Sequence, residues 1–184
     1  IEKVRVDLPE VVDHVVDLVK GRAQAKHLSL QVTLKPDLPR YCLSDPARVE
    51  QILLNVLSNA VKFTEAGGVT FNVSIQNAHL IFNVTDTGIG MSEAQVVSVF
   101  DPFLQGDNSS TRRFGGTGLG LSITKGLLDL MQGDIWVSSQ LGVGSTFELR
   151  IPYLPVSADE PCETVGGGLD HESAPLMGVS VLVA

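Results

Sequence analysis

The chain has 184 residues, 43% of them hydrophobic, which is enough to bury one substantial core and predicts one domain with a tail. Its formal net charge is −8, but five of the acids lie beyond residue 155, where there is no Lys or Arg, so residues 1–154 carry −3. A mildly acidic body argues against nucleic acid or an anionic membrane as a partner. Cys42 and Cys162 lack metal-ligand spacing, and no apolar run approaches the roughly 18 residues of a membrane-spanning helix. We therefore expect a cytoplasmic chain that is not itself inserted in a membrane.

The predicted elements begin with a short strand and a capped helix. Residues 4–6 have strand character, and Asp7 with Glu10 three positions later resembles a capping box. Alternating apolar residues over 28–34 then predict a half-buried strand. The helix between the two strands takes its apolar face from Val11, Val12, Val15, Val16, Leu18 and Val19.

The stretch 45–64 predicts a second amphipathic helix, with Asp45 as its cap and Pro46 in its first turn. Its buried stripe consists of Val49, Leu53, Val56, Leu57, Ala60 and Val61. Within an arc of about 60° on the opposite side lie two amides and two cations, namely Arg48, Asn55, Asn59 and Lys62. Such a ridge is either the solvated side of a helix or part of a binding site.

A hairpin follows this helix. Two alternating strands, over 69–75 and 80–85, come after a Gly67-Gly68 turn and are joined around Asn77. The second strand leads directly into Asp86.

The next part of the chain predicts two helices separated by a long loop. Ser92 and Gln95 form a second capping-box pattern, which opens a short helix ending near residue 100. Residues 101–116 have no periodicity and are long enough to be a functional loop. Residues 119–131 are helical, with Gly133 as the expected stop signal.

The C-terminal part predicts a final hairpin and a tail. Strands over 135–138 and 146–151 close a domain that we assign to residues 1–153. Proline, a glycine run and acidic residues predict a flexible linker over 154–177. Residues 178–184 look like the first strand of another domain.

Two glycine-rich runs carry the chemistry. In D-T-G-I-G, Gly88 and Gly90 let the backbone approach a ligand closely, and Asp86 offers a carboxylate to an exocyclic amine. In G-G-T-G-L-G, glycines immediately before a helix would expose backbone N–H groups to phosphate at its positive end, and these are Gly116, Gly118 and Gly120. Neither a Walker motif nor a Rossmann unit fits, because no G-K-[ST] follows and the hairpins are antiparallel.

The polar ridge supplies the complementary groups. Amide oxygens such as those of Asn55 and Asn59 are hard ligands that suit Mg²⁺ beside phosphates, and Lys62 adds a nearby cation. Arg112 and Arg113 in the loop could also contact phosphate. Solvation alone would equally explain Arg112.

Together these residues resemble the catalytic and ATP-binding domain of sensor histidine kinases over residues 1–153. N-V-L-S-N-A-V-K-F-T resembles the asparagine box of that family, D-T-G-I-G its first glycine box and F-D-P-F its phenylalanine box. G-G-T-G-L-G resembles the second glycine box and G-V-G-S-T-F the last glycine-threonine element, and all five occur in family order. The resemblance implies an α+β fold of the Bergerat type, a two-layer sandwich whose mixed, mostly antiparallel sheet is covered by helices on one face.

The resemblance also implies ATP and Mg²⁺ as cofactors and a role for each motif residue. Asn59 would be the Mg²⁺ ligand, Lys62 a phosphate contact and Asp86 the partner of the adenine amine. Residues 101–115 would form the ATP lid, anchored by Phe100 and Phe103. The implied catalytic residues are Asn55, Asn59, Lys62 and Arg113. The implied nucleotide-binding residues are Asn59, Lys62, Phe63, Asp86, Gly88, Ile89, Gly90, Phe103, Gly116, Thr117, Gly118, Leu119, Gly120 and Thr146, the last of them supporting the adenine from the final hairpin.

The implied function is transfer of the γ-phosphoryl group of Mg-ATP to a histidine of a dimerisation or histidine phosphotransfer domain, in the same or a partner kinase. None of the four histidines here has the H-E-x-R or H-D-x-R setting of an acceptor, so we expect the acceptor on a separate domain. Residues 178–184 resemble the opening of a receiver domain, which would make the parent a hybrid kinase that passes phosphate to a receiver domain or response regulator.

Two alternatives remain from other functional classes. One is a hydrolytic ATPase of the related gyrase and mismatch-repair type, in which a glutamate one helical turn before the metal-binding asparagine activates water. Asn55 occupies that position here, and an amide cannot act as the base. The other is a non-enzymatic module that binds nucleotide or a partner kinase.

Overall fold

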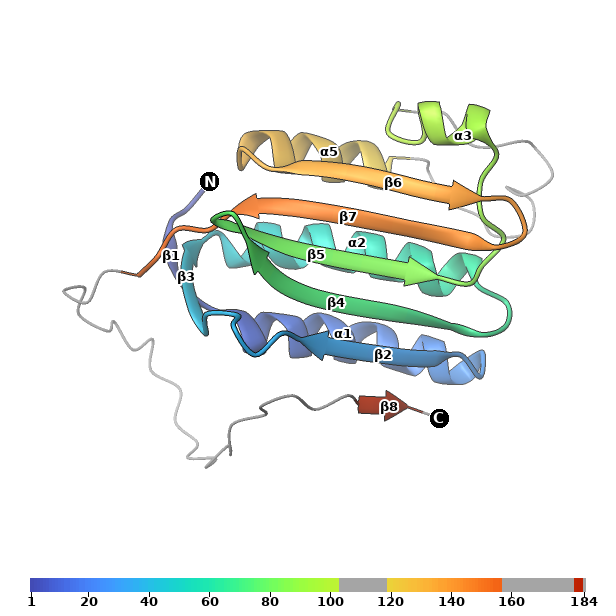
Figure 1. Ribbon diagram of the computed structural model, residues 1–184, viewed down its shortest axis with the longest axis horizontal. Helices are drawn as coiled ribbons and strands as arrows, with labels where there is room; N and C mark the ends of the chain where they lie inside the picture. Colours follow the sequence, from blue (N-terminus) through green and yellow to red (C-terminus); the bar gives the residue numbers. More distant parts are fainter. Residues whose placement is uncertain (103–118, 157–180, 184) are drawn as a thin grey trace.

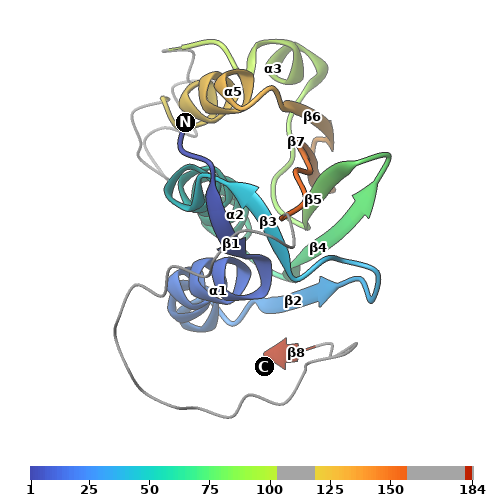
Figure 2. The same cartoon turned by 90° about the vertical axis from the view of Figure 1, so that its left-hand side faces the viewer.

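The computed structural model describes residues 1–102, 119–156 and 181–183 (Figure 1). Three long helices pack side by side against one face of a mixed sheet, as the side view in Figure 2 shows, and a fourth, short helix lies beside the edge strand β6. The helices are α1 (Leu8–Ala25), α2 (Pro46–Phe63), α3 (Glu93–Ser98) and α5 (Gly120–Leu130). The predicted two-layer α+β architecture, with helices on one face, is confirmed.

In the described part of the chain the main sheet has the strand order β6-β7-β5-β4-β2-β8. Neighbours β2 and β4 run parallel, and the other neighbouring pairs are antiparallel. The connection from β2 to β4 contains α2 and is therefore long enough for the crossover that a parallel pair of strands needs. The strands are β2 (Ser29–Leu34), β4 (Gly68–Gln76), β5 (His79–Asp86), β6 (Asp134–Gln140), β7 (Gly144–Pro152) and β8 (Val181–Val183).

Helix α2 lies at the centre of the helical layer, between α1 and α5. The Asp45 side chain accepts a hydrogen bond from the Arg48 N–H over 3.1 Å, which confirms the predicted cap. The predicted apolar stripe of α2 is buried. It packs on inward-facing strand residues such as Phe71 and Phe82, whose ring centroids lie 6.4 Å apart. Burial on one side leaves the opposite side of α2 for polar residues.

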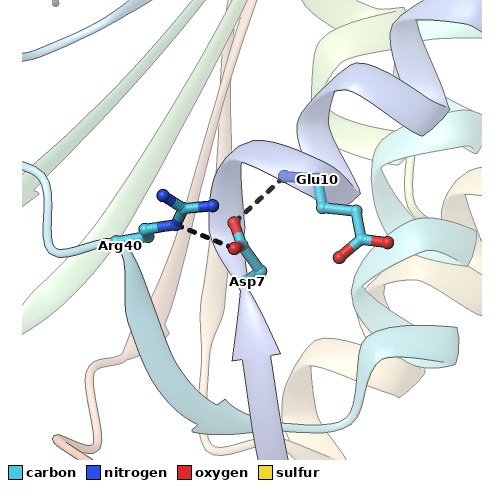
Figure 3. A network of polar contacts seen from close by, with 3 residues as sticks. All are labelled: Asp7, Glu10 and Arg40. Atoms are coloured by element: carbon cyan, nitrogen blue, oxygen red, sulfur yellow. Dashed lines mark hydrogen bonds and ion pairs between the residues drawn. The ribbon is translucent and has the colours of Figure 1, made fainter. Parts of the chain in front are cut away.

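A strand that the sequence did not predict, β3 (Tyr41–Ser44), pairs with β1 (Val4–Asp7) in a separate antiparallel ribbon. Asp7 links this ribbon to α1, because its carboxylate accepts from the Glu10 N–H over 3.4 Å and from Nε of Arg40 over 2.9 Å (Figure 3). The Glu10 carboxylate points away from Asp7. The predicted capping box is therefore made in one direction only, and the second oxygen of the Asp7 carboxylate is used for the ion pair with Arg40.

Helix ends match the sequence with one correction. Ser92 and Gln95 form the full predicted capping box, and α3 ends at Ser98, two residues before the expected end. At the end of α5 the left-handed residue is Gln132, with φ of 58°, and the Gly133 N–H returns to the Leu128 carbonyl over 2.8 Å. Gly133 is thus the stop that the sequence predicted, and the left-handed residue lies one position before it.

Strand β8 extends the main sheet at its outer edge (Figure 1). Its residues pair antiparallel with β2, with Leu30 opposite Val183 and Val32 opposite Val181. Most of the expected linker over 154–177 lies outside the described residues. The assignment of 178–184 to a further domain stays a prediction.

No helix in the described part of the chain is both long enough and apolar enough to cross a membrane.

Candidate functional site

Helix α2 contacts both glycine-bearing segments. Near its C-terminal end the Phe63 carbonyl accepts a hydrogen bond from the Ile89 N–H over 3.2 Å, which fixes the loop that follows β5. About two turns earlier in the helix, Asn55 lies against Gly120 at the start of α5, where any Cβ on residue 120 would collide with the Asn55 amide. The predicted asparagine and glycine motifs are therefore in contact in the folded chain.

The loop after β5 needs glycine at two positions. A Cβ at residue 88 would lie 2.5 Å from the Phe63 carbonyl oxygen and 2.8 Å from Oδ1 of Asp86. Gly90 has φ of 62°, the left-handed region, and a Cβ there would collide with the Gln140 carbonyl. The backbone of this loop is thus packed tightly between α2 and β6.

Asp86 ends β5 with its side chain turned toward the helical layer, where the residue is 7% exposed. Burial raises the pKa of the Asp86 carboxyl above its ordinary value, and hydrogen bonds from the backbone N–H groups of Gly88 and Ser145 partly oppose that rise. The Gly88 bond, to Oδ1, measures 2.8 Å. A buried carboxylate held by backbone donors is a fixed acceptor for a ligand N–H.

Asn55 and Asn59 differ in what their amides do. The Asn55 amide donates through Nδ2 to Oγ1 of Thr124 over 2.6 Å, and Thr124 is 1% exposed. The Asn59 side chain is half-buried, and within residues 1–102, 119–156 and 181–183 no hydrogen bond engages its amide. Asn55 is therefore committed to holding α5, whereas Asn59 can accept a ligand.

The two cations of the predicted ridge lie at opposite ends of α2. Lys62 Nζ lies 4.8 Å from the ring centroid of Phe63, in the last turn and within one helical turn of Asn59. Arg48 is near the start of the helix, about 16 Å along the axis from Asn59, and bonds Gln51 over 3.0 Å. Lys62 is therefore placed with the candidate site and Arg48 is not.

The donor set fits a divalent metal at one position. An amide oxygen such as that of Asn59 suits Mg²⁺, which keeps several waters and is commonly shared between protein and phosphate. Among the described residues, no three His, Cys, Asp or Glu side chains gather into a metal-binding group. A metal here would depend on oxygens from a bound phosphate in addition to Asn59.

Helix α5 begins at Gly120, after Leu119 in the N-cap position. Leu119 offers no side-chain cap, so within the described residues the N–H groups at the start of α5 have no capping side chain and could bind an anion. The preceding part of this motif and the predicted lid lie outside the described residues. The predicted site residues in that segment are Phe103, Arg113, Gly116, Thr117 and Gly118.

Thr146 is not brought together with Asp86. Along β7, Ser145 is the residue opposite Asp86, whereas Thr146 is opposite Thr85 and shares a hydrogen bond of 3.0 Å with it. Because side chains alternate between the faces of a strand, Thr146 lies on the face that the helices do not cover. The residue of this motif that contacts Asp86 is Ser145, which is 8% exposed.

Sequence reasoning also missed Ser139 of β6, which supports the same loop. Its hydroxyl accepts from the Met91 N–H over 2.8 Å, donates to the Gly144 carbonyl over 2.9 Å and lies 2.9 Å from Oγ of Ser145. The alternation of β6 contained the signal, because Ser139 has the parity of the buried Ile135. A serine on the inward face of a strand needs polar partners, and here it binds the loop.

The family of this domain follows from these features together with direct comparison. The model of the histidine kinase-, DNA gyrase B- and HSP90-like ATPases matches residues 44–155, more than half of the chain. The chain belongs to this family. Within it, the chain is homologous to the catalytic domains of sensor and hybrid histidine kinases.

Three relatives illustrate the similarity. The sensor histidine kinase RcsC of Salmonella typhimurium is 42% identical over 143 residues, covering 78% of this chain and 15% of RcsC. Hybrid signal transduction histidine kinase A of Dictyostelium discoideum is 44% identical over 139 residues, covering 69% of this chain and 6% of that protein. The solved structure of full-length ShkA in complex with AMPPNP has a TM-score of 0.75 and 35% identity, over 85% of this chain and 32% of ShkA. The chain thus spans a small part of the length of these relatives.

Proposed function

We propose that this domain binds Mg-ATP and transfers the γ-phosphoryl group to a histidine on the dimerisation or phosphotransfer domain of the same or a partner kinase. Two observations together support the proposal: Asp86 is buried and held by backbone donors, and on the helix packed against its loop the Asn59 amide has no hydrogen bond within the described residues. A receiver domain or response regulator would accept the phosphoryl group afterwards, as the hybrid organisation of a relative suggests. An ATP-dependent activity fits the cytoplasmic location expected from the sequence.

Each part of the nucleotide has a candidate partner. The Asp86 carboxylate accepts a hydrogen bond from the adenine amine, and the closely packed glycine loop shapes the pocket around the base. Lys62 and the first turn of α5 are directed to the phosphates. A bound Mg²⁺ would neutralise phosphate charge, and Asn59 is the residue that would hold it.

Phosphoryl transfer leaves mainly positioning and charge stabilisation to the protein. A neutral imidazole attacks phosphorus without first losing a proton, so the transfer needs no base on this domain. Water would need one, and the residue one turn before Asn59 is an amide already bonded to Thr124. This arrangement favours transfer to histidine over hydrolysis.

Calorimetric titration with Mg-ADP tests the binding step. Wild-type protein should bind, Asn59→Ala should lose most of the Mg²⁺ dependence, and Asp86→Ala should weaken binding at least about tenfold, or about 1.4 kcal/mol. Asn83→Ala is the matched control, because Asn83 lies on β5 with its side chain on the face that the helices do not cover. Absence of binding by the wild type, or equal loss in the control, would contradict the assignment.

A further inference from the structure

Lys26 follows α1 directly and reaches the end of α2. Its ammonium donates to three backbone carbonyls, those of Val61 over 2.9 Å, Lys62 over 2.7 Å and Thr64 over 3.0 Å. An ammonium has three N–H donors, so these contacts use all of them. Lys26 therefore caps the C-terminus of α2 through carbonyls that lie 35 to 38 residues further along the chain.

The capped carbonyls are ones that α2 cannot satisfy by itself. The last carbonyls of a helix have no intrahelical partner and form its negative end, which a cation stabilises. The Thr64 hydroxyl, fully buried, donates to the Ala60 carbonyl over 2.7 Å and closes the same turn from inside. Lys26 holds this turn from the α1 side.

The carbonyl between those that Lys26 binds has a different task. The Phe63 carbonyl accepts the Ile89 N–H and lies where a Cβ on Gly88 would collide with it. Of four neighbouring acceptors, three are fixed by Lys26 and the fourth fixes the glycine loop. The direction of the Phe63 carbonyl therefore depends on the turn that Lys26 caps.

We propose that Lys26 is a positioning residue for nucleotide binding, acting through the last turn of α2 on the loop that carries Asp86, Gly88 and Ile89. This inference rests on the proposed function of the same site. Without the ammonium, three carbonyls lose their common donor, and the turn samples arrangements in which the Ile89 bond is open. The apparent dissociation constant then rises in inverse proportion to the population of the competent arrangement.

The binding experiment compares Lys26 with a lysine inside α1. Lys26→Met keeps the aliphatic stem and removes the donors, whereas Lys20→Met changes an α1 lysine for which the described residues offer no polar partner. Titration with Mg-ADP should show affinity about threefold to tenfold weaker in Lys26→Met and unchanged in Lys20→Met. Lys26→Arg, which restores a charged donor, should bind within about twofold of wild type.

Amide exchange measures the same coupling without nucleotide. Exchange of the Ile89 N–H should be faster in Lys26→Met than in wild type, whereas that of the Met91 N–H, which is bonded to Ser139, should change little. If Lys26→Met does not fold, Lys26→Gln, which retains two donors, takes its place in both experiments.

The outcomes separate the two proposals. Failure of the wild type to bind Mg-ADP would contradict the proposed function, and the exchange result would still decide whether Lys26 fixes the loop. A variant that only melts earlier, with wild-type affinity and wild-type Ile89 exchange, would overturn the inference and leave Lys26 a structural cap.

Discussion

Asn55 of α2 and Thr124 of α5 are joined by a hydrogen bond of 2.6 Å between Nδ2 and Oγ1. This contact crosses the helical layer at the point where Gly120 leaves no room for a side chain between the two helices. The first asparagine of the motif therefore positions α5, the helix whose N-terminus we propose as a phosphate contact. Asn59, one turn later in α2, has no hydrogen bond to its amide within the described residues and can accept a ligand.

Replacing Thr124 by Val should destabilise the domain by about 1–2 kcal/mol, because the shape is kept while the Asn55 amide loses its acceptor in a buried contact. Urea denaturation measures the change. Thr70→Val is the control, since Thr70 is half-exposed on the face of β4 that the helices do not cover, and it should change stability by less than about 0.5 kcal/mol. Equal effects of the two substitutions would show that the contact contributes little.

Asp86 should make the site selective for adenine over hypoxanthine, because the carboxylate accepts from an exocyclic amine that inosine nucleotides lack. Titrations should give tighter binding of Mg-ADP than of Mg-IDP by at least about tenfold. Asp86→Asn should reduce the ratio of Mg-ADP affinity to Mg-IDP affinity. Equal affinities for the two nucleotides in the wild type would contradict the role of Asp86.

The same selectivity should depend on pH. Burial raises the pKa of the Asp86 carboxyl, so the ionised acceptor is lost at a higher pH than for an ordinary aspartate as acid is added. The ratio of ADP to IDP affinity should therefore shrink as the pH falls through this raised value. Because the folded carboxyl binds its proton more tightly than the unfolded one, Asp86 also lowers stability as the pH rises through the same window. A ratio that stays constant across the acid range would contradict this.

Two glycine substitutions should have opposite effects on the stability of the fold. Gly88→Ala should weaken Mg-ADP binding more than tenfold and destabilise the fold by about 1–3 kcal/mol, because the new Cβ collides with the Phe63 carbonyl. Gly126→Ala, inside α5 with no atom within 4 Å of the new Cβ, should stabilise by up to about 1 kcal/mol. Thermal unfolding and calorimetry measure both. Normal binding by Gly88→Ala would show that the loop packs less closely than described.

Cys42 should be inert in the folded protein. The residue is 1% exposed, and burial raises the pKa of its thiol to about 11, so the reactive thiolate is scarce near neutral pH. In a Cys162→Ser background, a thiol reagent should modify Cys42 at least about 100-fold more slowly in the native protein than in urea. Rapid labelling of the native protein would show that β3 opens readily.

Much of the fold could be predicted because local signals agreed with burial. Asp45 and Ser92 begin helices where the caps indicated, and the apolar stripe of α2 is the stripe that is buried. Strand β3 was missed because four residues between a proline-rich stretch and a helix cap give too short an alternation. Its pairing with β1 is a tertiary feature.

The candidate site was predicted less completely, for a related reason. Motif spacing located Asp86 and Asn59, but the register of β5 against β7 decides whether Ser145 or Thr146 faces Asp86. Lys26 donates to backbone carbonyls far along the chain, and the pattern of residue types does not predict contacts of that kind. Contacts between side chain and backbone across elements required the folded structure.

The central claim is transfer of a phosphoryl group to a histidine without competing hydrolysis. Incubation with Mg²⁺ and ATP labelled at the γ-phosphate, with and without a separately produced dimerisation domain of the parent kinase, measures both reactions at once. We predict acid-labile label on the histidine of the added domain, no label on this domain alone, and release of phosphate no faster than in buffer. Rapid release of phosphate without transfer would contradict the account in favour of a hydrolase, and tight binding with neither reaction would contradict it in favour of a binding module.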